Sequence, residues 1–295
     1  MVPGKAWTEE YLRRTRDYFW DKDFIPVLLK FLGVSRARRV LDVGSGLGYL
    51  ARLIESKARK AEEIYGIDLD GSLLRAARKY GKQADSIVKY RKMDASEIKF
   101  KDGSFDFVAA MTLFVNVTNP DEILREMIRV TGPNGTIAAL EPIYQTDGRS
   151  EYMPGYTESE YRFMNKLLSR RKRAATFVKG SDKYVAPRLP NMFAELGLKD
   201  VKAKAFAYAH LQKWDENGYD DYLDYLRKRS MEMERLKDTP ENVLDTLPTN
   251  SLRDAKRYIG ITKRRADRIL RNPAKYRSMI YSTTYTILAV KGKKT

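Results

Sequence analysis

The chain has 295 residues with no cysteine and one histidine, which excludes disulfides, thiolate zinc sites, cysteine nucleophiles and multi-histidine metal sites. A hydrophobic fraction of 43% beside a charged fraction of 32% is enough for a packed core, so a wholly disordered chain is also excluded. The net charge of +17 favours nucleic acid, anionic lipid or acidic proteins as partners, although a solubilising, thermophile-like surface explains it equally well.

No apolar run approaches the roughly 20 residues that span a bilayer, and residues 1–10 carry no apolar segment of the signal-peptide kind. We therefore expect a cytoplasmic protein that is not an integral membrane protein, present as a monomer or homodimer. The carboxylates do not cluster along the sequence, so we predict no metal site.

The first half of the chain alternates short apolar runs with amphipathic segments. A helix is predicted over residues 7–32 and ends at Gly33. The strands that follow are predicted at 39–43, 64–68, 87–91, 105–111 and 136–140. The helices between them are predicted at 47–60, 71–80 and 121–130. Asn119 is the expected cap of the last helix, Pro120 its first residue, and 131–135 a turn. This alternation is typical of a parallel α/β sheet.

A glycine loop follows the first strand, in the run Asp42-Val43-Gly44-Ser45-Gly46-Leu47-Gly48. Glycines at alternate positions let the backbone approach a ligand, and the next helix directs its N–H groups at that ligand. Asp68 ends the second strand, where a carboxylate can accept hydrogen bonds from both ribose hydroxyls. Asp94 and Ala95 follow the third strand, within reach of an adenine amino group. Because open α/β sheets bind ligands at the carboxyl ends of their strands, we expect these elements to line one crevice.

The spacing of the glycines favours S-adenosylmethionine (SAM) over NAD. The dinucleotide pattern G-x-G-x-x-G needs glycine where Tyr49 stands, and Gly48 comes one position too early. Asp42, just before the glycines, suits a ligand with an amino group better than a pyrophosphate.

These residues resemble the first motif and the ribose-binding acid of class I SAM-dependent methyltransferases. Residues 102–108 resemble the approach to that family's fourth strand, and residues 129–136 resemble the turn before its fifth strand. The resemblance covers residues 38–142. It implies SAM as cofactor, SN2-type methyl transfer and an α/β fold. That fold is a Rossmann-like, seven-stranded, mostly parallel sheet with helices on both faces and a final antiparallel strand.

Within that class, residues 115–118 and 140–142 are similar to the ubiquinone/menaquinone C-methyltransferases, which carry R-N-V-T-D and L-E-F at those places. Val115, Asn119 and Pro142 replace the arginine, aspartate and phenylalanine of that pattern. The similarity places Asn116 and Glu141 near the cleft.

After Glu141 the alternation breaks, and a helix at 189–196 and strands at 201–211 and 281–290 complete the expected elements. We expect an N-terminal helical cap over 1–32 and a SAM-binding core over 33–146. Helical, substrate-side lid insertions are expected over 147–188 and 213–279, and closing elements of the core over 189–212 and 280–295.

The predicted cofactor-binding residues share positions at strand ends and in the loops that follow them: Asp42, Gly44, Ser45, Gly46, Gly48, Tyr49, Asp68, Leu69, Asp94, Ala95, Met111 and Thr112. Glu141 and His210 are candidate catalytic groups, the first at a strand end and the second as the chain's one imidazole. Asn116, Tyr144 and Tyr18 are candidate substrate contacts. The structural alternatives are a helix cap for Asp68, a packed imidazole for His210 and aromatic packing for the tyrosines.

Three functions remain open at this point. The first is methyl transfer to a small-molecule or lipid-like acceptor held under a helical lid. The second is RNA or protein methylation, with the basic runs 170–173 and 263–271 as a docking surface whose binding weakens with salt. The third is SAM binding without turnover.

Overall fold

The protein is described by a computed structural model that covers 8, 9, 12, 13, 23–143, 151–152, 155–174, 185–212, 216–246, 251–277 and 281–295. The chain forms two compact units. The first contains residues 1–144, 179–208 and 285–295, and the second contains residues 145–178 and 209–284.

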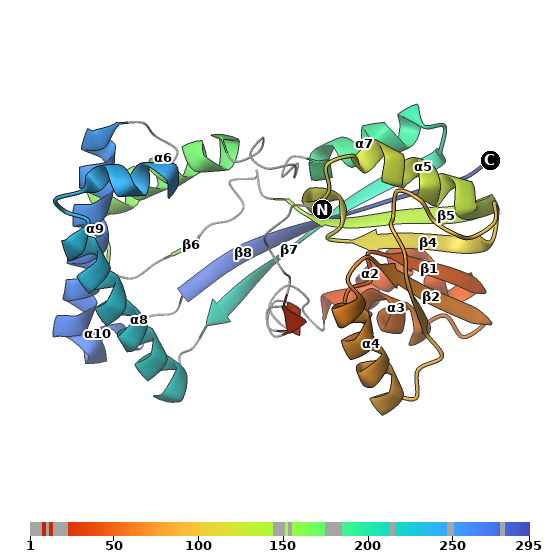
Figure 1. Ribbon diagram of the computed structural model, residues 1–295, viewed down its shortest axis with the longest axis horizontal. Coiled ribbons are helices and arrows are strands. Elements are labelled where there is room, and N and C mark those ends of the chain that lie inside the picture. Colours follow the sequence, from red (N-terminus) through yellow and green to blue (C-terminus); the bar gives the residue numbers. More distant parts are fainter. Residues whose placement is uncertain are drawn as a thin grey trace. The chain divides into compact units, whose positions relative to one another are not determined.

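The first unit is built on a sheet in the order β3-β2-β1-β4-β5-β8, with β7 paired to β8 (Figure 1). Its strands are β1 (Arg39–Val43), β2 (Glu63–Asp68), β3 (Lys89–Lys92), β4 (Phe105–Met111), β5 (Thr131–Pro142), β7 (Lys199–Gln212) and β8 (Tyr281–Lys293). The pairs from β3 to β5 are parallel, and β8 is antiparallel to β5. These seven strands confirm the predicted sheet. A short strand, β6 (Glu151–Tyr152), pairs with β8 inside the second unit.

Helices cover both faces of this sheet, as predicted (Figure 1). They are α2 (Phe24–Leu32), α3 (Tyr49–Glu55), α4 (Gly71–Gln83), α5 (Pro120–Val130) and α7 (Val185–Glu195). Leu41 and Val43 of β1 pack in the core formed with α5 and α7, whereas Val40 packs in the core formed with α2 and α3. This alternation is the two-residue period of a strand buried on both sides, and it explains the continuous apolar run.

One boundary differs from the prediction at the start of β5. Residues 131–135, predicted as a turn, form the first part of β5, and the register with β4 shifts between Phe105 and Phe107. The N–H of Asn134 donates to the carbonyl of Lys294 at 2.8 Å. The N–H of Lys294 donates in turn to the carbonyl of Gly135 at 3.1 Å, so the end of the chain pairs with this segment although Asn134 is left-handed, with φ of 60°. Helix α2 ends at Gly33, as predicted, and Gly33 adopts a left-handed conformation with φ of 79°.

The second unit is mainly helical. Its described elements are α6 (Glu158–Ala174), α8 (Glu216–Arg235), the 3-10 helix η4 (Pro240–Thr246), α9 (Leu252–Arg271) and α10 (Pro273–Arg277). The carboxylate of Glu160, with 8% of its side chain exposed, pairs with Arg268 at 2.7 Å and Arg264 at 3.0 Å. The hydrogen bond from Arg268 is the main reason that the pKa of Glu160 falls to about 2. Among the helices that the structure describes, none has the length and apolar character needed to cross a bilayer.

Replacement of Gly48 by alanine tests the tight packing beneath the glycine loop. Gly48 has φ of 73°, and a Cβ there would overlap the hydroxyl of Tyr90. We expect Gly48→Ala to lower the free energy of unfolding by about 2–4 kcal/mol, measured by urea denaturation.

Gly197→Ala is the matched control, because its φ is 83° but, apart from its chain neighbours, no atom of the described residues lies within 4 Å of a Cβ built there. It should lose about 1 kcal/mol from backbone strain alone. Equal losses in the two variants would contradict the proposed contact with Tyr90.

Candidate functional site

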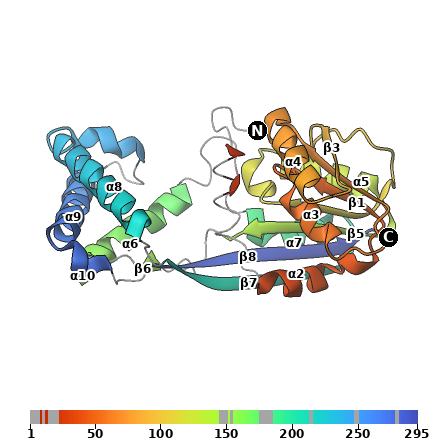
Figure 2. The ribbon, with the colours of Figure 1, turned by 90° about the horizontal axis from the view of Figure 1, so that it is seen from below.

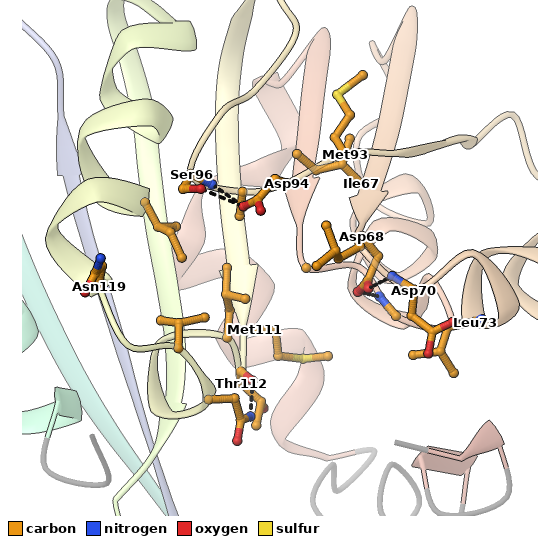
Figure 3. Close-up of a pocket in the computed structure, with 18 of the residues that line it drawn as sticks. Ile67, Asp68, Asp70, Leu73, Met93, Asp94, Ser96, Met111, Thr112 and Asn119 are labelled. Carbon is orange, nitrogen blue, oxygen red and sulfur yellow. Dashed lines mark hydrogen bonds between the residues drawn. The ribbon is translucent and has the colours of Figure 1, made fainter. Parts of the chain in front are cut away.

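The loops after β1, β2, β3 and β4 line a cavity of about 400 Å³ in the first unit (Figure 3). Because these strands are parallel, their carboxyl ends meet at one edge of the sheet, as the sequence predicts. Nine of the predicted residues line it: Gly44, Gly46, Asp68, Leu69, Asp94, Ala95, Met111, Thr112 and Asn116. The structure therefore gathers residues from four separate loops around one space.

Asp68, the predicted ribose contact, joins two of these loops. Its Oδ2 accepts the N–H of Gly46 and its Oδ1 accepts the N–H of Asp70, each at 2.9 Å (Figure 3). Burial raises the pKa of this carboxyl above its ordinary value, and the two N–H groups oppose that shift. Each oxygen keeps a second lone pair, so both can still accept a hydroxyl. The cap of α4 is Asp70, which accepts the N–H of Ser72 at 2.7 Å. Asp68 is therefore not needed for that role.

Asp94 is held by the turn that follows β3. Its Oδ1 accepts the N–H and the hydroxyl of Ser96, at 2.9 and 2.7 Å (Figure 3). The backbone and side-chain hydrogen bonds from Ser96 lower the pKa of Asp94, so it remains an acceptor at neutral pH. A fixed carboxylate at this strand end is well suited to an amino group.

Four predicted cofactor residues do not belong to the cavity lining found among the described residues. Asp42 is 1% exposed, and its Oδ2 accepts the N–H of Ala51 at 3.0 Å. It thereby secures the first turn of α3, which begins at Tyr49. Ser45 is buried, and Gly48 packs on Tyr90 as described above. These residues therefore stabilise the glycine loop on the side that does not line the cavity.

The loop after β4 is strained at the cavity wall. Thr112 has φ of 55°, a left-handed conformation that is unfavourable for a β-branched residue by about 1–3 kcal/mol. Its N–H donates to the carbonyl of Leu140 at 2.8 Å, and Nδ2 of Asn116 donates to the carbonyl of Thr112 at 2.8 Å. Strain that is held in this way is a common feature of binding sites.

Glu141, predicted as a catalytic group, holds the same loop. It is completely buried, and its Oε1 accepts the N–H groups of Leu113 at 2.8 Å and Phe114 at 2.9 Å. Its Oε2 accepts the N–H of Val115 at 3.3 Å. In this arrangement Glu141 reaches the site through the backbone of the loop, and the lining found among the described residues does not include its side chain.

The remaining candidate residues are His210, Tyr18 and Tyr144. His210 belongs to β7, in the part of the strand assigned to the second unit, and its side chain lies outside the described residues. Tyr18 and Tyr144 also lie outside the described residues. Their proposed roles stay predictions.

The sequence did not identify several residues that line the cavity: Leu12, Ile67, Asp70, Leu73, Met93, Ser96, Leu113, Val117, Thr118, Asn119, Glu122 and Ile123. Asn119 precedes α5 as predicted but makes no side-chain cap, and its Nδ2 instead donates to Glu122 at 3.1 Å. The apolar residues of this set could not be identified, because their sequence pattern is the same as that of core positions. Asp70 and Glu122 could have been identified as lining residues from the sequence. Asp70 is an acid just after the end of a strand, and Glu122 is an acid at the start of a helix.

Replacement of Glu141 tests how strongly the carboxylate holds the loop. Glu141→Ala leaves three backbone N–H groups, two of them buried, without their acceptor, so we expect a loss of about 3–5 kcal/mol in the free energy of unfolding. Glu141→Gln keeps one acceptor oxygen and should lose about half as much.

The control for both variants is Glu122→Gln, on the exposed first turn of α5, which should change stability by less than about 0.5 kcal/mol. If Glu141→Ala were as stable as the unmodified chain in urea denaturation, the loop would not depend on this carboxylate.

Sequence comparison agrees with this geometry. Residues 41–139 match the family model of a methyltransferase domain. The ubiquinone/menaquinone biosynthesis C-methyltransferase UbiE of Laribacter hongkongensis is 33% identical over 113 residues, which are 38% of this chain and 46% of that protein. UbiE of Pseudomonas paraeruginosa is 32% identical over 115 residues, which are 38% of this chain and 45% of that protein. The chain thus spans about half the length of the curated relatives it matches.

Solved structures share the fold. Phosphoethanolamine N-methyltransferase 2 of Haemonchus contortus, in complex with phosphomonomethylethanolamine and S-adenosylhomocysteine, has a TM-score of 0.52 at 17% identity, over 98% of this chain and 58% of that chain. A protein of Bacillus halodurans C-125 has a TM-score of 0.52 at 17% identity, over 92% of this chain and 99% of that chain.

The glycine loop, Asp68, the strand order and the matched family together define a class I SAM-dependent methyltransferase domain, with SAM as its cofactor. Within that class, the sequence of the domain is similar to the UbiE C-methyltransferases.

Proposed function

We propose that the protein transfers the methyl group of SAM to a small-molecule or lipid-like acceptor. The proposal rests on the hydrogen bond from the N–H of Gly46 to the carboxylate of Asp68. This bond lies at the edge of a cavity that Asp94 also lines. This arrangement provides acceptors for a ribose and for an adenine amino group beside a backbone that a ligand can approach closely.

The charge of the cavity lining also fits SAM. The charged side chains of the lining are all acidic among the described residues: Asp68, Asp70, Asp94 and Glu122. An acidic lining in a chain of net charge +17 favours a cationic ligand over a pyrophosphate. SAM, when bound, supplies an electrophilic methyl group on a positively charged sulfur that is also the leaving group.

The protein's part in the reaction is then to bind, orient and exclude water. We assign the ribose to Asp68 and the adenine amino group to Asp94, with the glycine loop alongside the rest of the cofactor. Glu141 acts as a positioning residue, because it fixes the loop that carries Thr112 and Asn116. A general base is needed only for an acceptor that starts protonated. His210 remains our candidate for that role.

The acceptor is proposed from two observations. The relatives are named as ubiquinone/menaquinone C-methyltransferases, which favours a small aromatic or lipid-like molecule. In the basic run of α9, Lys263 pairs with Asp267, and Arg264 and Arg268 pair with Glu160. Cations engaged within the chain are less available to phosphates, which weakens the proposal of RNA docking. We assign acceptor selection to the second unit, because it lies beyond residues 41–139.

The affinity for SAM should depend on pH through Asp68. Only the ionised carboxylate accepts hydrogen bonds from both ribose hydroxyls, and burial raises the pKa of Asp68. We therefore expect the Kd of SAM to fall as pH rises through this elevated pKa, above the ordinary aspartate range, and to level off at higher pH.

Calorimetric titration at several pH values measures this dependence. Asp68→Asn should bind SAM at least about tenfold more weakly and show no such pH dependence, because an amide cannot ionise. Asp102→Asn, a carboxylate on the surface outside the cavity lining, is the control and should behave as the unmodified chain. An Asp68→Asn variant with unchanged affinity would remove Asp68 from the ribose site.

Transfer of a labelled methyl group from SAM tests the acceptor class. We expect labelling of a molecule in an organic extract that contains quinones and other lipids, with little change between low and moderate salt. Labelling of RNA or protein that falls steeply with salt would favour the second function instead. Saturable SAM binding with no labelled product in any extract would favour a binding protein without turnover.

A further inference from the structure

Four lysines gather on two neighbouring strands of the first unit. They are Lys202 and Lys204 of β7 and Lys291 and Lys293 of β8, and we call them the lysine cluster. Burial first, and then the positive charges of the other three, lower the pKa of Lys291. Within the described part of the chain, no member of the cluster forms an ion pair with a carboxylate. The cluster therefore concentrates positive charge that the protein does not neutralise locally.

Aromatic rings lie directly beneath this charge. The ring of Phe31 has the ammonium of Lys204 at 5.3 Å from its centroid and that of Lys291 at 4.9 Å. Phe206 packs on Phe24 with ring centroids 4.6 Å apart and on Phe31 at 6.3 Å. Contacts between β7, β8 and α2 therefore make the lysine cluster continuous with the apolar side of α2, which lies along β7 in Figure 2.

Helix α2 extends this surface with an exposed apolar side chain, Val27, beside the half-buried rings of Phe24 and Phe31. Val27 is 53% exposed, and the spacing of Phe24, Val27 and Phe31 puts the three side chains on one side of the helix. Lys30 beside them is exposed as well. A helix that faces water alone would carry polar residues at such positions. Ammonium groups next to exposed apolar side chains are instead typical of surfaces that lie in a membrane interface.

We propose that the lysine cluster and the exposed side of α2 bind the surface of an anionic lipid bilayer. Lysine stems can lie along apolar surface while their ammonium groups reach lipid phosphates. Nucleic acid is less suited, because the cluster has no arginine for bidentate phosphate contacts and its rings pack on one another and under lysines.

A protective role at a sheet edge accounts for only part of the surface. Lysines on an exposed edge strand discourage pairing with other chains, and this would explain Lys202 and Lys204 of β7. It does not explain Lys291 and Lys293, because β8 lies between β5 and β7. It does not explain the exposure of Val27 either. The bilayer surface accounts for Lys202, Lys204, Lys293 and Val27, whereas the ammonium group of Lys291 donates to the carbonyl of Phe31 and joins the cluster to α2. The proposal does not depend on the proposed acceptor.

The test uses the full chain with phosphatidylcholine vesicles, with and without phosphatidylglycerol, in a flotation assay. We expect binding to vesicles that contain phosphatidylglycerol and none to phosphatidylcholine alone. A lysine near an anionic surface contributes about 1 kcal/mol, so Lys202→Gln/Lys204→Gln should bind about 25-fold more weakly. Val27→Ser should weaken binding severalfold while leaving net charge unchanged.

The matched control is Lys79→Gln/Lys82→Gln, which removes the same charge from exposed positions on α4 beside β3, at the other edge of the sheet. It should keep binding within about twofold of the unmodified chain. Equal loss in the two double variants would show attraction by net charge alone and overturn the proposal. Unchanged vesicle binding by Lys202→Gln/Lys204→Gln would also overturn it. Binding of single-stranded RNA through the same lysines, without binding of the vesicles, would overturn it as well. An unchanged SAM affinity in each variant confirms that the fold is intact.

Discussion

The hydrogen bond from Gly46 to the carboxylate of Asp68 is the contact on which the site depends. Parallel pairing of β1 with β2 brings the ends of both strands to one edge, and this bond joins the loops that follow them. Glu141 performs a similar task across β4 and β5, where one buried carboxylate receives three backbone N–H groups. Both carboxylates replace hydrogen bonds that the irregular loop backbone cannot make within the sheet. The two carboxylates therefore hold the loops that line the cavity.

The sheet and the cofactor end of the site could be predicted because their signals are local. A buried parallel strand is a short apolar run, and glycines directly after it mark a backbone that must approach a ligand. The rest depends on contacts that are distant in sequence. The predicted turn is included in β5, where the N–H of Asn134 donates to the carbonyl of Lys294, and no local pattern reveals that partner. The orientation of Glu141 toward the backbone of another loop was hidden for the same reason.

Charge is distributed unevenly over the first unit. The cavity carries acidic side chains, whereas the lysine cluster on β7 and β8 is basic and borders α2, where Val27 is exposed. The net charge of +17 is therefore the sum over surfaces of opposite charge, an acidic cavity and a basic lysine cluster. The first suits a cationic cofactor, and the second suits an anionic surface.

The most direct test of the central claim is a calorimetric comparison of SAM, S-adenosylhomocysteine and NAD as ligands of the full chain. We expect micromolar binding of both adenosyl ligands and competition between them for one site, with no heat from NAD. Binding of NAD without binding of SAM would contradict the account, because it would mean that the glycine loop and Asp68 serve a dinucleotide.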